Sequence, residues 1–314
     1  MPRNIGLLFF ICEVLLVIEV FKTTLNLEEL KVKREKLNAR NFEIQLLGGS
    51  IGKSDKLIED FGMCASLLDN VISVHTALTN KEGIMPGGNC DIGYLYERSV
   101  MLALDDACFI ANIAALNQSH RVGVVIHNSL SYEQFSRNPY FLTTVIDTLG
   151  MLLMKYPNIE FWIENVTPIC KEHPITFKNG CINDSADICK HLRQQFGDRI
   201  GAVFDTCHAI TTARILQDLG CDYVFPGMLE AFSGVCKEVH FANVRGYGLK
   251  EGQHGCGFDP ANPTDVVKLE GLLSNCMEYF PNAYLCYEIT ETDYIVNQQT
   301  YETMNLVNDI LNNR

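Results

Sequence analysis

The chain has 314 residues, of which 47% are hydrophobic and 20% are charged, a composition that excludes a disordered or fibrous protein. Its 25 Lys and Arg against 38 Asp and Glu give a formal charge of −13, which repels phosphate backbones and anionic membranes. No run of Lys or Arg offsets this charge locally, so we expect neither stable duplex DNA binding nor a membrane partner.

The 13 Cys residues form no C-x-x-C pair and are odd in number, which favours reduced thiols and a cytoplasmic protein. An apolar segment at 5–21 is interrupted by Glu13 and Glu19 and has no small-residue cleavage site after it. We interpret this segment as a buried first strand that runs into further apolar structure. A targeting or anchoring segment is the alternative.

Short runs rich in Val, Ile and Phe alternate with longer amphipathic stretches, the pattern of βα units around a parallel sheet. The pattern predicts strands at 5–10, 42–47, 71–75, 122–127, 159–164, 200–205, 238–243 and 283–289. It predicts helices at 27–37, 55–68, 92–116, 141–156, 185–196, 209–219, 264–279 and 300–311. Eight strands that are each followed by a helix favour an α/β fold, a single (β/α)₈ TIM barrel, over an open doubly wound sheet.

In a parallel barrel the active site lies at the carboxyl ends of the strands. Imidazole and carboxylate side chains stand at the predicted ends of the last six strands or in the loops that follow: His75, His127, Glu164, Asp205, His208, His240, His254 and Glu288. So many buried ionisable groups need compensating cations. Mixed nitrogen and oxygen ligands suit Zn²⁺, with Mn²⁺ or another divalent metal as alternatives. The other three histidines, His120, His173 and His191, are interpreted as structural or exposed.

The stretch Gly201-Ala-Val-Phe-Asp-Thr-Cys-His-Ala209 resembles a signature of the endonuclease IV branch (apurinic/apyrimidinic endonuclease family 2) of the xylose isomerase-like TIM barrels. The resemblance covers core motifs at 71–290 and implies a single xylose isomerase-like TIM barrel domain at 1–314. It also implies a cluster of two or three zinc ions. The first ion would be held by His75, His127 and Glu164, the second by Glu164, Asp205, His240 and Glu288, and the third by His208 and His254.

Three positions depart from the family pattern. Gly252 stands where the family has an Asp ligand for the third ion, with Glu251 and Asp259 nearby. The stretch at 240–245, which ends in Arg245, lacks the family's Asp and Lys, and the loop after His75 lacks the aromatic residue that the family inserts into damaged DNA. The fold and the metals are therefore transferred more directly than the substrate.

The leading interpretation is a zinc-dependent phosphoester hydrolase. Glu164 would bridge two metals and position the attacking hydroxide, while Arg245 or Lys250 would neutralise a phosphate. The net charge and the missing aromatic residue favour a small phosphoester as substrate, with a nucleic-acid end as an alternative.

The runner-up is a single-metal isomerase or epimerase of a sugar or sugar phosphate. Glu164 and Glu288 would move the proton between carbons, and His208 and Arg245 would contact the substrate. This mechanism does not require the pair of histidines on the third and fourth strands. A third interpretation is a barrel without catalysis that serves a binding role.

Overall fold

The structure is a computed structural model that describes residues 17–78, 90–166, 184–218, 220–222, 224–246 and 253–313. The predicted first strand at 5–10, together with His173, Lys250, Glu251 and Gly252, lies outside these residues. No helix in the described ranges combines the length and the apolarity needed to cross a membrane.

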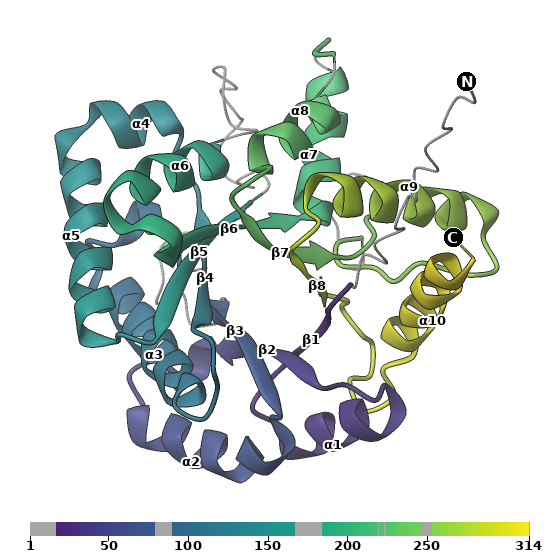
Figure 1. The fold of residues 1–314 in the computed structure, drawn as a ribbon, viewed down its shortest axis with the longest axis horizontal. Coiled ribbons are helices and arrows are strands. Elements are labelled where there is room, and N and C mark those ends of the chain that lie inside the picture. Colours follow the sequence, from purple (N-terminus) through teal and green to yellow (C-terminus); the bar gives the residue numbers. More distant parts are fainter. Residues whose placement is uncertain are drawn as a thin grey trace, which may run out of the picture.

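Eight parallel strands close into a barrel in sequence order (Figure 1), which confirms the predicted fold class. Helices lie around the outside of the barrel, as Figure 1 also shows. The strands are β1 (Glu19–Thr23), β2 (Asn41–Leu47), β3 (Asn70–Leu78), β4 (Val122–Asn128), β5 (Ile159–Asn165), β6 (Ile200–Asp205), β7 (Cys236–Phe241) and β8 (Tyr284–Tyr287).

The first barrel strand lies at Glu19–Thr23, so the predicted position at 5–10 is wrong. The apolar run extends over 5–21, and hydrophobicity alone does not tell which part of such a run joins the sheet. Pairing with both neighbours decides the position, because Phe21 is in register with Phe42 of β2 and with Tyr287 of β8. This double pairing leaves the sheet without an open edge.

The main helices include all eight predicted ones and two that the sequence did not predict, α4 and α8. Their bounds are α1 (Leu27–Lys36), α2 (Ser54–Cys64), α3 (Arg98–Ala115), α4 (Tyr132–Arg137), α5 (Pro139–Lys155), α6 (Asp184–Phe196), α7 (Thr206–Asp218), α8 (Val224–Phe232), α9 (Pro263–Tyr279) and α10 (Gln298–Asn312). Helix α4 begins with a capping box between Ser131 and Gln134, and Asn138 then caps α5.

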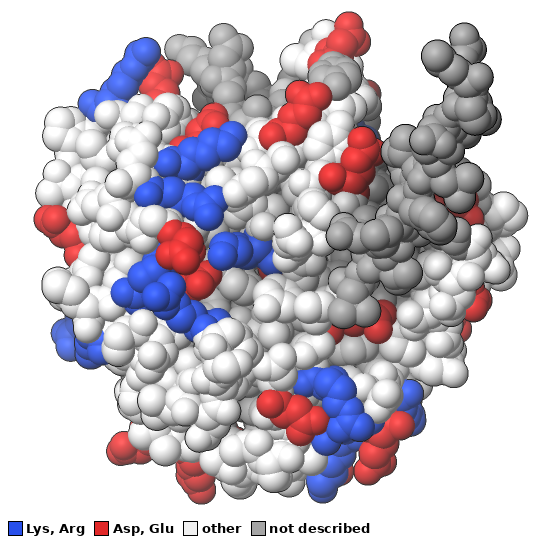
Figure 2. Space-filling model, viewed as in Figure 1, with Lys and Arg blue, Asp and Glu red and all other residues white. Residues whose placement is uncertain are grey.

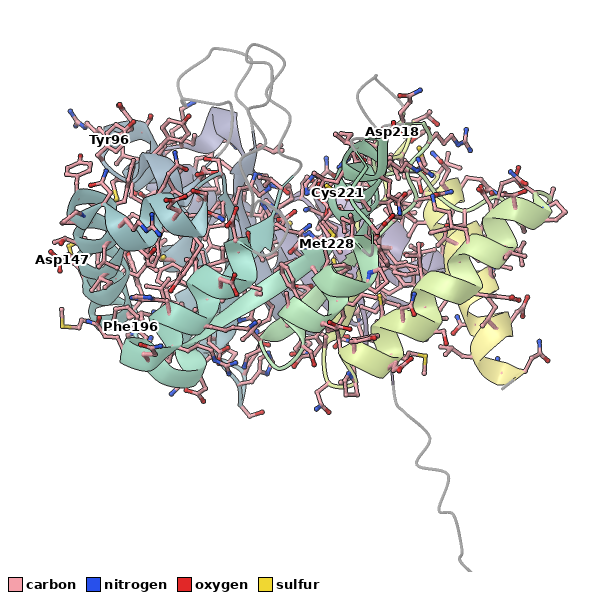
Figure 3. All side chains as sticks on the ribbon, turned by 90° about the horizontal axis from the view of Figure 1, so that it is seen from above. Tyr96, Asp147, Phe196, Asp218, Cys221 and Met228 are labelled. Carbon is pink, nitrogen blue, oxygen red and sulfur yellow. The ribbon has the colours of Figure 1, made fainter. Side chains whose placement is uncertain are left out.

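Most helices return the chain from the carboxyl ends of the strands to their amino ends. The side view in Figure 3 shows this arrangement: Tyr96, which precedes α3, lies toward one end of the barrel, and Phe196, where α6 ends, lies toward the other. The loops that precede the helices therefore surround the carboxyl ends of the strands, where a TIM barrel carries its functional site.

The barrel is packed on both faces of its sheet. Outward side chains such as Phe42 and Phe161 belong to the main core, which they share with the helices. The barrel interior holds a second apolar cluster made of Val20, Ile72, Val125, Trp162, Val203 and Cys286. Gly123 and Gly201 make room for the indole, because a Cβ atom on Gly123 would lie 2.4 Å from Trp162 Cδ2. Side chains alternate along a strand, so the next inward position lies two residues further on.

The ten cysteines in the described ranges are free thiols. Acidic and basic side chains are interspersed on the face shown in Figure 2. Ion pairs in the described chain include Arg121 with Asp198 and Lys237 with Glu160.

Candidate metal centre

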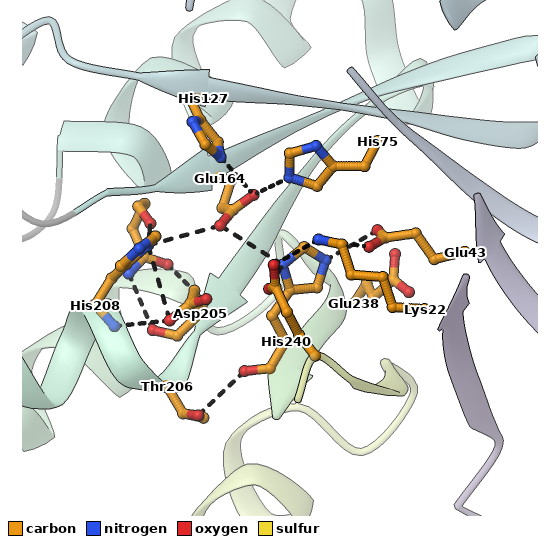
Figure 4. A network of polar contacts seen from close by, with 12 residues as sticks. Lys22, Glu43, His75, His127, Glu164, Asp205, Thr206, His208, Glu238 and His240 are labelled. Carbon is orange, nitrogen blue, oxygen red and sulfur yellow. Dashed lines mark hydrogen bonds and ion pairs between the residues drawn. The ribbon is translucent and has the colours of Figure 1, made fainter. Parts of the chain in front are cut away.

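A layer of polar side chains lies at the carboxyl ends of the strands, next to the apolar cluster of the barrel interior. Most of its members lie two positions after an inward-facing apolar residue of the same strand, and the others lie at the same level on neighbouring strands. The members are Lys22, Gln45, His75, His127, Glu164, Asp205, His240 and Glu288. Figure 4 shows most of these side chains pointing toward one another from different strands. The alternation of the strands therefore brings together groups that are far apart in the sequence.

Glu164 lies at the centre of this layer. Its Oε2 atom is 3.0 Å from His75 Nε2 and 3.4 Å from His127 Nε2, and its Oε1 atom is 3.5 Å from His240 Nδ1 and 3.6 Å from His208 Nδ1. Burial alone would raise the pKa of this carboxyl, but His127 and His240 hold the pKa well below its usual range. Glu164 is thus an ionised, buried carboxylate surrounded by imidazoles.

The turn from β6 to α7 positions the next two groups. Asp205 ends β6, and its Oδ1 atom accepts a hydrogen bond of 2.7 Å from the backbone N–H of His208 in the first turn of α7. Thr206, the first residue of α7, donates its hydroxyl to the carbonyl of His240 at 3.1 Å and so ties this turn to β7. Burial raises the pKa of Asp205. The D-T-C-H stretch of the sequence is therefore a strand-to-helix turn that aims two ligand-type side chains at the cluster.

His254 approaches the same place from the loop after β7. Its ring centroid is 4.7 Å from that of His208, and burial together with the neighbouring His208 lowers its pKa. A neutral imidazole has a lone pair available for a metal, which a protonated one lacks.

The cluster contains overlapping groups of ligand atoms that all lie within 4.8 Å of one another. Three of these groups match the predicted metal sites: His75, His127 and Glu164; Glu164, Asp205, His240 and Glu288; and Asp205, His208 and His254. The structure thus brings together all the side chains that the sequence nominated as ligands. Their roles as ligands stay predictions.

The hydrogen bonding within the cluster differs between these groups. In the described chain, His240 Nδ1, Glu288 Oε2 and His254 Nε2 are buried without a hydrogen-bond partner. The first two atoms lie 2.6 Å apart, but not in hydrogen-bonding geometry. Burial alone would lower the pKa of His240, but the glutamates around it raise that pKa well above its usual range, so a metal bound to Nδ1 would take the place of a proton. His75 differs, because Nδ1 contacts the carbonyl of Thr76 at 2.8 Å and Nε2 contacts Glu164.

Three further charged residues belong to this layer or to the layer below it, and the sequence analysis missed them. Lys22 of β1 contacts Glu43 of β2, and both Glu43 and Glu238 of β7 are fully buried. Burial alone would raise the pKa of Glu43, but His240 and Lys22 hold it at about 2, whereas burial and Glu43 raise the pKa of Glu238 to about 8. A charged residue within an otherwise buried strand is the signal that could have found them.

The remaining predicted residues lie apart from the cluster. Arg245 is exposed on the loop after β7, where its backbone N–H donates to the carbonyl of Gln253 at 2.8 Å. Its predicted contact with substrate stays a prediction. His120 contacts the carbonyl of Val71, and His191 contacts the hydroxyl of Tyr132, so both are structural as expected.

No known protein family and no curated protein matches the chain in sequence. Solved structures do match it in fold. A xylose isomerase domain protein from Planctomyces limnophilus aligns over 94% of this chain and 98% of its own, with a TM-score of 0.61 and 11% identity. A D-tagatose 3-epimerase-like protein aligns over 93% and 98%, with a TM-score of 0.58 and 14% identity. The IolI protein with a bound zinc atom aligns over 93% and 98%, with a TM-score of 0.54 and 12% identity.

The chain therefore has the fold of the xylose isomerase-like TIM barrel proteins. This agrees with the superfamily that the D-T-C-H stretch suggests. The neighbours do not specifically support the endonuclease IV branch within it.

Proposed function

We propose that the protein is a divalent-metal-dependent isomerase or epimerase that acts on a sugar or sugar phosphate. The observation that carries the proposal is the group of Glu164, Asp205, His240 and Glu288, whose ligand atoms converge within 4.8 Å. This group contains two of the buried atoms that lack a hydrogen-bond partner, on His240 and Glu288. Three carboxylates and one imidazole suit Zn²⁺, Mn²⁺ or a similar cation.

Within this site the two glutamates would carry out the proton transfer. Glu164 ends β5 and Glu288 follows β8, so their carboxylates reach one cluster from different sides of the barrel. When bound, the metal would polarise the carbonyl and hydroxyl oxygens of the substrate and so acidify the C–H bond of the hydroxyl-bearing carbon next to the carbonyl. One glutamate would then remove a proton from that carbon and the other would return a proton to it or to its neighbour. His208, with 14% of its side chain exposed, would contact a substrate hydroxyl.

The structural neighbours support this class of reaction. A D-tagatose 3-epimerase-like protein and a zinc-containing IolI protein share the fold along nearly their whole length. Their names associate this fold with sugar epimerisation and with zinc binding.

Phosphoester hydrolysis remains the second candidate because the group of His75, His127 and Glu164 is also assembled. The ring nitrogens of His75 already contact Glu164 and the carbonyl of Thr76, so this group has less need of an additional cation. Zinc as the particular metal and a third ion at His208 and His254 are likewise proposals.

The test combines two assays on the full-length protein loaded with Zn²⁺, Mn²⁺, Co²⁺ or Mg²⁺. Incubation with a panel of ketoses, aldoses and their phosphates in D₂O should place deuterium on a carbon next to a carbonyl, and Glu164→Gln should prevent this. Hydrolysis of bis(p-nitrophenyl) phosphate provides the phosphoesterase assay. Metal-dependent hydrolysis without deuterium incorporation would replace our proposal by the second candidate.

A further inference from the structure

We propose that Glu43 and Lys22, on the first two strands, are positioning residues that fix two ligands of the metal centre, His240 and Glu288. This inference rests on the metal centre of the proposed function, but not on the identity of the substrate. The four side chains form a closed ring of contacts: Lys22 contacts Glu43 and Glu288, and His240 contacts the same two glutamates. Figure 4 labels Lys22, Glu43 and His240 of this ring.

Glu43 determines which nitrogen of His240 faces the metal position. Its Oε2 atom is 3.0 Å from His240 Nε2, and both side chains are completely buried. A carboxylate only accepts hydrogen bonds, so Nε2 carries the proton and donates it. The other nitrogen, Nδ1, is then directed at Glu164 and Glu288, at 3.5 Å and 2.6 Å. A carboxylate behind a histidine ligand fixes the tautomer and the ring orientation in many metal sites.

Lys22 holds the second ligand and the carboxylate behind the first. Its Nζ atom is 2.5 Å from Glu288 Oε1 and 3.0 Å from Glu43 Oε1, and 12% of its side chain is exposed. Because Lys22 engages Oε1, the Oε2 atom of Glu288 is directed toward His240. The ammonium also offsets the charge of Glu43, which no water reaches. One lysine therefore aligns both ligands.

A spectroscopic measurement on the unaltered protein tests the orientation directly. In a long-range ¹H–¹⁵N spectrum of histidine-labelled, zinc-loaded protein, His240 should show a protonated Nε2 and a zinc-bound Nδ1. His240→Gln, which lacks the resonance, provides the assignment. Zinc on Nε2 would overturn the inference, and this result does not depend on any variant of Glu43 folding.

Variants of the pair test its effect on metal affinity. Glu43→Leu and Lys22→Met should each weaken Zn²⁺ binding about 10- to 100-fold in competition with a chelating dye. Glu43→Gln should recover part of the loss, because its amide oxygen still accepts from Nε2. Glu238→Gln is the matched control: Glu238 is equally buried on β7, but its carboxyl oxygens make no hydrogen bond to any residue that the structure describes, so affinity should stay within roughly twofold.

The outcomes separate this inference from the proposed function. Wild-type affinity in Glu43→Leu and Lys22→Met would overturn the positioning role while leaving the metal centre intact. Equal losses in Glu43→Leu and Glu43→Gln would also overturn it, because the hydrogen bond would then be irrelevant. A wild-type protein that binds no divalent ion would overturn both proposals. Loss of sugar turnover alone bears only on the proposed function.

Discussion

Glu164 has two carboxylate oxygens that face different sets of imidazoles. Oε2 contacts His75 and His127, whereas Oε1 faces His208 and His240. Both enzyme mechanisms considered above therefore make Glu164 a ligand, and one of them also makes it a bridge between metals. A substitution at this residue tests the metal centre as a whole, and substitutions of the imidazoles distinguish its parts.

Glu164→Gln keeps the volume of the side chain and removes its charge. We expect bound metal to fall below stoichiometric amounts and turnover to fall at least about 100-fold, because a ligand and an acid–base group are lost together. Elemental analysis and the deuterium-incorporation assay measure these two quantities, and circular dichroism checks that the fold is retained. His191→Gln is the control, since His191 lies on α6 and contacts Tyr132 instead of the cluster. Unchanged turnover in Glu164→Gln would exclude both mechanisms.

The double variant His75→Gln with His127→Gln separates the two candidate functions. A hydrolase that holds an ion between these histidines and Glu164 should lose about one metal per chain, because one carboxylate is too few ligands for zinc. The isomerase proposal predicts unchanged metal content, since the group of Glu164, Asp205, His240 and Glu288 remains. Loss of one equivalent together with loss of phosphoesterase activity would favour the hydrolase.

At the scale of the strands and helices, Gly123 illustrates why the barrel interior tolerates little change. This residue lies on β4 beside Trp162 of β5, and a Cβ atom would lie 2.4 to 2.5 Å from three atoms of the indole. Gly123→Ala should therefore lower the free energy of unfolding by about 1 to 3 kcal/mol in urea denaturation. Gly271→Ala within α9 is the control and should raise it by up to about 1 kcal/mol, because its Cβ meets nothing within 4 Å. Equal effects of the two substitutions would contradict this account.

The strand pattern could be predicted from the sequence wherever polar loops bound a short apolar run. The predicted run at 200–205 coincides with β6, and those at 122–127 and 159–164 differ from β4 and β5 by one residue. The first strand could not be placed, because pairing with β2 and β8 selects Glu19–Thr23 from a longer apolar run. Helix α8 escaped prediction because its sequence, VFPGMLEAF, contains Pro and Gly, which are usually helix breakers.

The candidate site was predictable only in part, because the relative shift of the strands also decides which side chains reach it. His75, His127 and Glu164 stand at strand ends, where the barrel rule directs attention. Lys22 lies within β1, for which the sequence predicted a different position. Glu43 and Glu238 lie near the starts of their strands instead of at the ends. Whether such side chains reach the site depends on how far each strand is shifted relative to its neighbours, which three-dimensional closure sets.

Glu238 of β7 should make the free energy of unfolding depend on pH. Burial and the nearby Glu43 raise the pKa of its carboxyl from an ordinary value of 4.5 to about 8. Between these values the folded protein binds a proton that the unfolded chain does not, so this contribution to stability is complete below pH 4.5 and is lost as the pH rises through 8.

Glu238→Gln should remove this loss of stability at rising pH. The free energy of unfolding of the metal-free variant, relative to metal-free wild type, should therefore increase by up to about 1.4 kcal/mol per pH unit between pH 5 and 8. Urea denaturation at four pH values measures the difference. A difference that is constant with pH would show that Glu238 is ionised in the folded state.

At the scale of the whole molecule, the candidate ligands come from six of the eight strands or from the segments that follow them. The cluster also concentrates negative charge in a chain that already has a formal charge of −13. Glu43, Glu164, Asp205 and Glu288 lie together with Lys22 as the nearest ammonium in the described network. A bound cation would relieve this repulsion and connect strands on opposite sides of the barrel.

Removal of metal should therefore destabilise the entire barrel rather than one loop. A ligand that binds only the folded state stabilises it by about 2.7 kcal/mol at a free concentration 100 times its Kd, and the gain increases with the logarithm of concentration. We expect EDTA to lower the thermal midpoint of the metal-loaded protein, and added Zn²⁺ or Mn²⁺ to restore it with this dependence. Glu164→Gln should respond more weakly to both additions, because its folded state has lost the central ligand. If EDTA strips the metal, as shown by elemental analysis, and the midpoint does not change, the cation is not bound among these strands.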